Sequence, residues 1–111
     1  MGFQLLNVIT AQDESVLQHY AFDSEHLSIP LDLTAAAAES RFLGSAPDTI
    51  VRVLRTENVT SNLHHDGVPP AKFQASKRLT DFFRVISTNL DRKGKEFIST
   101  VEGFKCVPLA M

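Results

Sequence analysis

Two segments rich in β-branched and aromatic residues lie close together in the last third of the chain, at residues 84–89 and 96–102. The stretch between them, Asp91-Arg92-Lys93-Gly94-Lys95, is polar and contains one glycine. A connection of this length and composition is typical of a turn between antiparallel strands. The sequence therefore predicts an antiparallel hairpin at this end of the fold, and any architecture for the chain has to accommodate it.

The first half of the chain shows a helical and a strand-like pattern. Residues 3–9 are apolar around almost two full turns, which predicts a helix that is buried on most sides. Residues 27–33 alternate apolar and polar side chains, the pattern of a half-buried strand, and Pro30 places that strand at a sheet edge. The alanines at 35–38 indicate a helical start or a surface of small residues for close packing.

Four further signals complete the pattern of mixed helices and strands. Pro47 suits the first turn of a helix whose core-facing residues are Ile50, Val51 and Leu54. Residues 59–64 have the composition of a short strand. Gly67, Pro69 and Pro70 mark a loop. Ser76 suits the N-cap of a helix from which Leu79, Phe82 and Phe83 point to one side.

Composition narrows the classes of function. The chain has 111 residues, the length of one domain, and its formal net charge of −2 argues against a nucleic-acid partner, which requires a basic face. We expect no membrane partner, because no apolar run approaches the ~20 residues of a membrane span. Gln4 and Asn7 interrupt the apolar stretch at 3–11, which also lacks a positively charged flank, so we expect no signal peptide here.

Several stretches together resemble one enzyme family. They are Asn62-Leu63-His64, the run from Leu79-Thr80-Asp81-Phe82-Phe83 to Asn89-Leu90-Asp91, and Glu96-Phe97-Ile98-Ser99-Thr100-Val101-Glu102-Gly103-Phe104-Lys105. The start, Met1-Gly2-Phe3, resembles the second half of a Gly-Thr-Cys-(Leu or Met)-Gly-Phe turn. In this order and spacing they are similar to folate gamma-glutamyl hydrolase, a member of the class I glutamine amidotransferase-like superfamily.

The resemblance implies a fold class and the part of the catalytic domain that this chain covers. The expected class is α/β, as part of a flavodoxin-like three-layer sandwich with a C-terminal antiparallel hairpin. Residues 1–111 would form a single partial domain, the C-terminal portion of the catalytic domain, truncated at both ends. The family's nucleophilic cysteine would stand one residue before Met1. Its Trp-His-Pro-Glu motif, with the catalytic histidine, would follow Lys105, where this chain reads Cys106-Val107-Pro108.

The resemblance also assigns roles to individual residues. We expect no catalytic residue in the chain, and we interpret Met1 and Gly2 as the remnant of an oxyanion hole at a helix N-terminus. His64 matches a family histidine near the substrate cleft and is the predicted substrate-binding residue. Adjacent His64 and His65 would point to opposite faces of a strand, so we predict no metal site. Cys106 has no following helix to lower the pKa of its thiol and is interpreted as an incidental cysteine.

The implied reaction is thiol-dependent cleavage of gamma-glutamyl bonds in folate polyglutamates without a cofactor, and this chain alone is expected to be inactive. Two alternatives stay open: a glutamine amidotransferase-like domain, and a non-catalytic partner of an intact homologue. We expect that exposed strand edges let the chain form a homo-oligomer. By resemblance the location is vacuolar or lysosomal, or extracellular, with which the glycosylation sequon at Asn58 is compatible.

Overall fold

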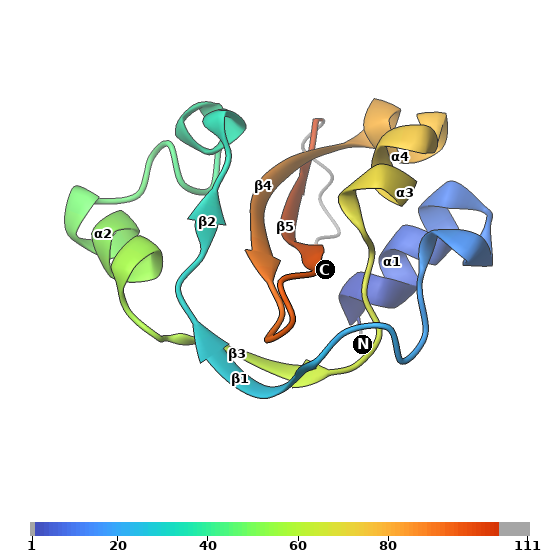
Figure 1. The fold of residues 1–111 in the computed structure, drawn as a ribbon. Helices are drawn as coiled ribbons and strands as arrows, with labels where there is room; N and C mark the ends of the chain where they lie inside the picture. The colour runs from blue at the N-terminus through green and yellow to red at the C-terminus, as the bar shows by residue number, and fades with distance from the viewer. Residues whose placement is uncertain (1, 105–111) are drawn as a thin grey trace.

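The structure is a computed structural model that describes residues 2–104 (Figure 1). Met1 and Cys106 therefore lie outside the described residues, and the predictions made for them are not addressed by the fold. The described chain is an α/β structure with two antiparallel sheets and four α-helices. This confirms the predicted fold class at the level of α/β.

The predicted C-terminal hairpin is present. Strand β4 (Phe83–Leu90) pairs antiparallel with β5 (Glu96–Gly103), with Leu90 opposite Glu96, Phe83 opposite Gly103 and an irregularity in the register around Ser87. The Asp91 carboxylate accepts hydrogen bonds from the backbone N–H groups of Lys93 (2.9 Å) and Lys95 (2.8 Å). Gly94 has φ +81°, a conformation that favours glycine. The turn is therefore fixed by its own side chains and by that glycine.

The single strand predicted at residues 27–33 is wrong, because the chain breaks at Pro30. Strand β1 (Ser24–Ile29) pairs with β3 (Thr60–His64) in a two-stranded sheet. The two-residue strand β2 (Asp32–Leu33) instead pairs with β4, on the side of β4 opposite β5. Pro30 has no N–H to donate to a ladder, so the interruption falls where the proline stands and the chain changes sheets there.

The helices lie on both sides of the three-stranded sheet (Figure 1). Helices α1 (Gly2–Ala11), α3 (Pro70–Ala75) and α4 (Lys77–Phe82) lie on one side of the sheet. The 3₁₀ turn η1 (Glu14–Val16) follows α1 in the chain. The 3₁₀ turn η2 (Ala35–Glu39) and helix α2 (Asp48–Thr56) lie on the other side. The alanine run is thus a 3₁₀ turn, and Pro47 occupies the N-cap of α2.

Three details of the helix predictions are wrong. Ile50 of α2, predicted to face the core, is 52% exposed. Helix α1 is not buried on most sides: Leu5 is 56% exposed and Ile9 is 62% exposed, because only its inner face meets the rest of the fold. Leu79, Phe82 and Phe83 do not share one face, because α4 ends at Phe82 and Phe83 begins β4. Ser76 does cap α4, since its side chain accepts a hydrogen bond from the N–H of Leu79, as predicted.

Two hydrophobic clusters hold the sheet to its helices. The larger cluster joins α1, α3 and α4 to the hairpin, and its buried members are Ala11, Val16, Val68, Phe73, Leu79, Phe83 and Ile98. The smaller one joins η2 and the following loop to β4 through Ala37, Leu43 and Ile86. Among residues 2–104, no helix has the length and apolar character needed to cross a membrane.

Candidate functional site

A groove of about 550 Å³ opens between α1, the segment around η1 and the ends of β1 and β3. Its lining combines apolar side chains with histidines and carboxylates. The lining residues are Gln4, Leu5, Val8, Glu14, Leu17, His19, Tyr20, Glu25, Leu63, His64, His65 and Asp66. Such a mixture of apolar surface and a few convergent polar groups is typical of a site for a small organic ligand.

His64, the predicted substrate-binding residue, lines this groove and is half-buried. Its Nε2 lies 3.2 Å from Oδ1 of Asn62, two residues earlier on the same face of β3. Its ring meets Phe97 of β5 edge to face, with the ring centroids 5.5 Å apart. The Ser24 hydroxyl donates to the His64 carbonyl oxygen at 2.6 Å. These contacts fix both the backbone and the ring of His64.

The same burial sets the charge of His64. Loss of solvent around the imidazole, the largest influence, lowers its pKa below the ordinary value of 6.5, although a hydrogen bond with the backbone of Asp66 acts in the opposite direction. His64 is therefore neutral at neutral pH. Asn62 donates its own amide N–H to the Leu27 carbonyl oxygen at 3.1 Å, so its Oδ1 remains free to accept from Nε2–H of His64.

Asp66 organises the rim of the groove, a role that the sequence did not indicate. Its carboxylate accepts the backbone N–H of Tyr20 at 2.9 Å and contacts Nδ1 of His19 at 3.0 Å. The hydrogen bond from Tyr20, the main cause, lowers the pKa of the Asp66 carboxyl below its usual value of 3.8. Asp66 and His19 are 47 residues apart in sequence, and no local pattern signals the pair.

His65 follows His64 directly after β3, lines the same groove and pairs with another carboxylate. Its Nε2 lies 3.2 Å from Oε2 of Glu25, and its Nδ1 lies 3.4 Å from the Phe22 carbonyl oxygen. Within residues 2–104, no group of three or more His, Cys, Asp or Glu side chains is arranged to hold a metal ion. The site therefore consists of separate histidine–carboxylate pairs.

Helix α1 brings its first turn to the groove. Gly2 begins the helix, and Gln4, two residues later, lines the groove and places its Nε2 3.4 Å from the Asp66 carbonyl oxygen. The start of α1 and the segment that carries His64 thus lie together. Whether Gly2 contributes to an oxyanion hole, or His64 to substrate binding, stays a prediction.

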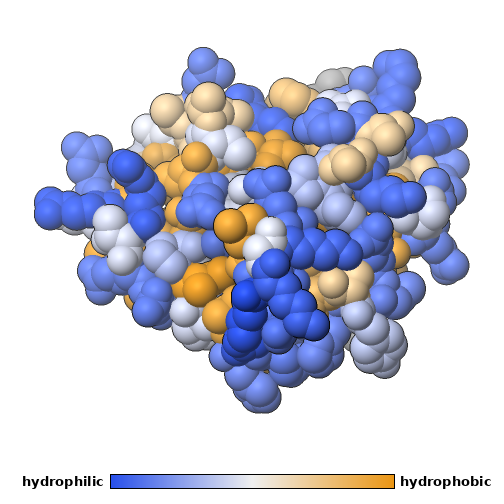
Figure 2. Space-filling view, in the orientation of Figure 1, coloured by the Kyte–Doolittle hydropathy of each residue, from blue (hydrophilic) through white to orange (hydrophobic). Residues whose placement is uncertain are grey.

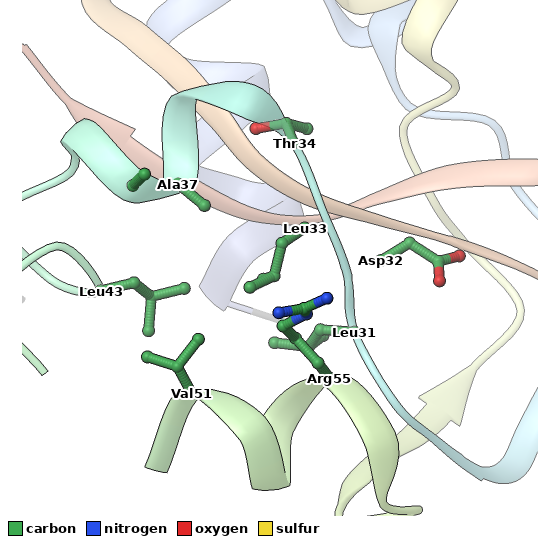
Figure 3. Close-up of a pocket in the computed structure, with 9 residues that line it drawn as sticks. Leu31, Asp32, Leu33, Thr34, Ala37, Leu43, Val51 and Arg55 are labelled. Carbon is green, nitrogen blue, oxygen red and sulfur yellow. The ribbon is translucent and has the colours of Figure 1, made fainter. Parts of the chain in front are cut away.

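A second pocket, of about 560 Å³, lies between α2, η2 and β2 (Figure 3). Leu43 and Val51 point toward one another across it, and Arg55 extends toward Leu33, whereas Asp32 points to the other side of its strand. Figure 2 shows hydrophobic side chains at the surface on this side of the molecule. The lining combines six apolar residues with Asp32, Thr34 and Arg55, and it contains none of the residues that the sequence predicted for a site.

The fold and the first groove define the class: an α/β protein with an open groove suited to a small organic molecule. No family model matches the sequence. The chain is 37% identical over 98 residues to gamma-glutamyl hydrolase B of Dictyostelium discoideum, an alignment that covers 88% of this chain and 28% of that protein. It is 34% identical to the mouse gamma-glutamyl hydrolase and 33% to the human one, over 95% of this chain and 32% of each relative.

These similarities show that the chain belongs to the gamma-glutamyl hydrolase family, as a segment of its sequence. It spans about 30% of the length of the curated relatives that it matches. The resemblance first noted in the hairpin and at His64 is thereby confirmed across most of the chain.

Proposed function

We propose that this chain supplies one wall of the substrate groove of a gamma-glutamyl hydrolase and that the ligand is a folate polyglutamate. The observation that carries the proposal is the position of His64, which is half-buried and held in place by Asn62 and Phe97 while it lines an open groove. A neutral imidazole in such surroundings can exchange a hydrogen bond with an uncharged group, such as the amide of a gamma-glutamyl bond, without the cost of desolvating a charge.

The proposal assigns binding, not bond cleavage, to the 111-residue chain. Thiol-dependent hydrolysis of an amide bond requires a cysteine thiolate beside a general base and an oxyanion-binding site. The one cysteine of the sequence, Cys106, has none of the Gly-Thr-Cys context that carries the nucleophile in the resembling family. Purified chain is expected to leave folate polyglutamates intact, and turnover that Cys106→Ala abolishes would contradict this assignment.

Three broader expectations belong to the same proposal. We take residues 1–111 as part of one domain whose complete form is a flavodoxin-like three-layer sandwich. The proposed location is vacuolar, lysosomal or extracellular. In support, Asn58 of the sequon Asn58-Val59-Thr60 is exposed, as a glycosylated asparagine has to be. Expression in a eukaryotic secretory host, followed by a glycosidase-sensitive shift in mass that Asn58→Gln removes, tests the accessibility of the sequon.

The binding role is tested with the dipeptide gamma-glutamylglutamate, titrated against the 111-residue chain by calorimetry and by amide chemical shifts. We expect saturable binding that His64→Ala weakens by about tenfold or more, the scale of a lost hydrogen bond to a buried partner. His64→Gln retains a donor toward Asn62 and should retain part of the affinity. His26→Ala is the matched control, because His26 is an exposed histidine that does not line the groove.

Two results would refute the role of His64. One is the absence of saturable binding to the wild-type chain. The other is an affinity that His64→Ala leaves unchanged while only the thermal stability falls, which would make His64 a structural residue that supports Phe97. Both binding measurements are made at a temperature at which circular dichroism shows that every variant is folded.

A further inference from the structure

Tyr20 is an exposed aromatic residue whose backbone is held in an unusual conformation. Its side chain is 86% exposed and its φ is +54°, in the left-handed region that bulky residues rarely adopt. The conformation is stabilised because the Tyr20 N–H donates to Oδ1 of Asp66, whose other oxygen contacts His19. Backbone strain of this kind is concentrated at functional sites.

The ring of Tyr20 lies on the ring of His65. The two planes are 28° apart and their centroids 6.2 Å apart, a stacked arrangement. Both nitrogens of His65 face oxygen acceptors, on Glu25 and at the Phe22 carbonyl, which fixes the plane of the imidazole. Because Tyr20 is so exposed, its other face is open to solvent, and the pair presents a flat aromatic surface at the rim of the groove.

The charges around this surface disfavour the acidic part of a ligand. Glu14, Glu25 and Asp66 all line the groove, and within residues 2–104 no Lys or Arg lines it. Glu25 and Asp66 each contact a histidine, whereas Glu14 forms no ion pair within residues 2–104. At the Tyr20–His65 rim of the groove, a neutral planar ring is therefore accommodated more readily than a carboxylate.

We propose that Tyr20 and His65 form an aromatic platform that binds a planar ring of the ligand by stacking. The inference rests on the proposed function, because a folate polyglutamate carries such rings, an aminobenzoyl group and a pterin, at the end opposite its gamma-glutamyl tail. The platform gives the groove a preference for gamma-glutamyl compounds that carry an aryl group over those that do not.

The test compares three probes on the 111-residue chain by calorimetry: gamma-glutamylglutamate, p-aminobenzoyl-gamma-glutamylglutamate and pteroyl-gamma-glutamylglutamate. We expect the two aryl compounds to bind about three- to tenfold more tightly than the dipeptide, the range of one aromatic contact. Tyr20→Ala removes this preference without changing the affinity for the dipeptide, and Tyr20→Phe retains it. Phe42→Ala, which truncates an exposed aromatic side chain outside the groove, leaves all three affinities unchanged.

The outcomes separate this inference from the proposed function. If the dipeptide binds in a His64-dependent manner but Tyr20→Ala leaves the affinity for the aryl compounds unchanged, the platform is refuted and the role of His64 stands. If the aryl compounds bind through Tyr20 while the dipeptide does not bind, the platform stands and the proposed role of His64 fails. If none of the three probes binds, both are refuted. Melting curves of each variant show that a lost affinity is not a lost fold.

Discussion

The side-chain amide of Asn89 donates a hydrogen bond of 2.6 Å to the carbonyl oxygen of Pro30, at the point where the chain leaves the β1–β3 sheet for the three-stranded sheet. Asn89 is only 3% exposed, and its Oδ1 accepts the hydroxyl of Ser99, also at 2.6 Å. One buried side chain thus joins the hairpin to the crossing between the two sheets.

Asn89→Ala is expected to lower the free energy of unfolding by about 1–3 kcal/mol, because the Pro30 carbonyl and the Ser99 hydroxyl lose a buried partner. The measurement is urea denaturation followed by circular dichroism. Asn58→Ala, at an exposed asparagine, is the matched control and should change the value by less than about 0.5 kcal/mol. Equal effects of the two substitutions would show that the crossing does not depend on Asn89.

The hairpin turn depends on Asp91. Burial alone would raise the pKa of its carboxyl, but hydrogen bonds from the N–H groups of Asp23, Lys95 and Lys93 bring the pKa below 3.8. Asp91→Ala leaves these three donors without their acceptor, and we expect a loss of about 1–3 kcal/mol. Faster amide exchange at Lys93 and Lys95 in the variant would locate the loss in the turn, and unchanged exchange there would contradict it.

Acidification is expected to destabilise the fold in two pH ranges. His64 has a lower pKa folded than unfolded, so its contribution is fully present above pH 6.5 and is lost as the pH falls through its folded pKa. The Asp91 contribution is present above pH 3.8 and is lost at still lower pH. Unfolding free energies measured from pH 8 to about pH 2.5 should therefore decline below pH 6.5 and again below pH 3.8. A first decline of the same size in His64→Gln would show that His64 is not its cause.

Local patterns predicted the elements that depend on local contacts. The hairpin was readable because its turn residues and its strands are adjacent in sequence, and the Ser76 cap because capping acts over three residues. The break at Pro30 could not be predicted in this way, because the apolar–polar alternation continues through residues 27–33. The hydrogen-bond partner of the Pro30 carbonyl is also 59 residues away in sequence. The exposure of Leu5 and Ile9 depends on which elements pack against α1. The pattern of apolar residues within the helix does not predict those neighbours.

The candidate site was only partly predictable for the same reason. His64 was found through the resemblance of Asn62-Leu63-His64, and the structure adds that Asn62 contacts its ring. Asp66 and Tyr20 are 46 residues apart, and their contact joins the turn after η1 to the segment that follows β3. An exposed tyrosine in a left-handed conformation has no signature in the sequence, so the aromatic platform became visible only in three dimensions.

Glu102 near the end of β5 provides a further test of long-range contacts. Its two carboxylate oxygens accept the backbone N–H groups of Arg41 (3.0 Å) and Phe42 (2.9 Å), while the Arg41 guanidinium donates to the carbonyl oxygens of Gly103 and Phe104. Glu102→Ala should speed amide exchange at Arg41 and Phe42. The exposed Glu57 gives the control substitution Glu57→Ala, and protection at Arg41 that survives in Glu102→Ala would contradict the contact.

Helix α1 is expected to be the least protected helix of the 111-residue chain and the surface through which it associates. Leu5, Leu6 and Ile9 are 56%, 47% and 62% exposed, and each Å² of apolar surface left in water forgoes roughly 25 cal/mol. Slow hydrogen exchange should therefore concentrate in α4, β4 and β5, and sedimentation should show a concentration-dependent increase in mass. Leu5→Lys and Ile9→Lys together should abolish that increase at little cost to the free energy of unfolding, because neither residue belongs to the buried clusters. A monodisperse monomer with a sharp, cooperative melt and slow exchange extending to Leu5 and Leu6 would show instead that the chain stabilises α1 by itself.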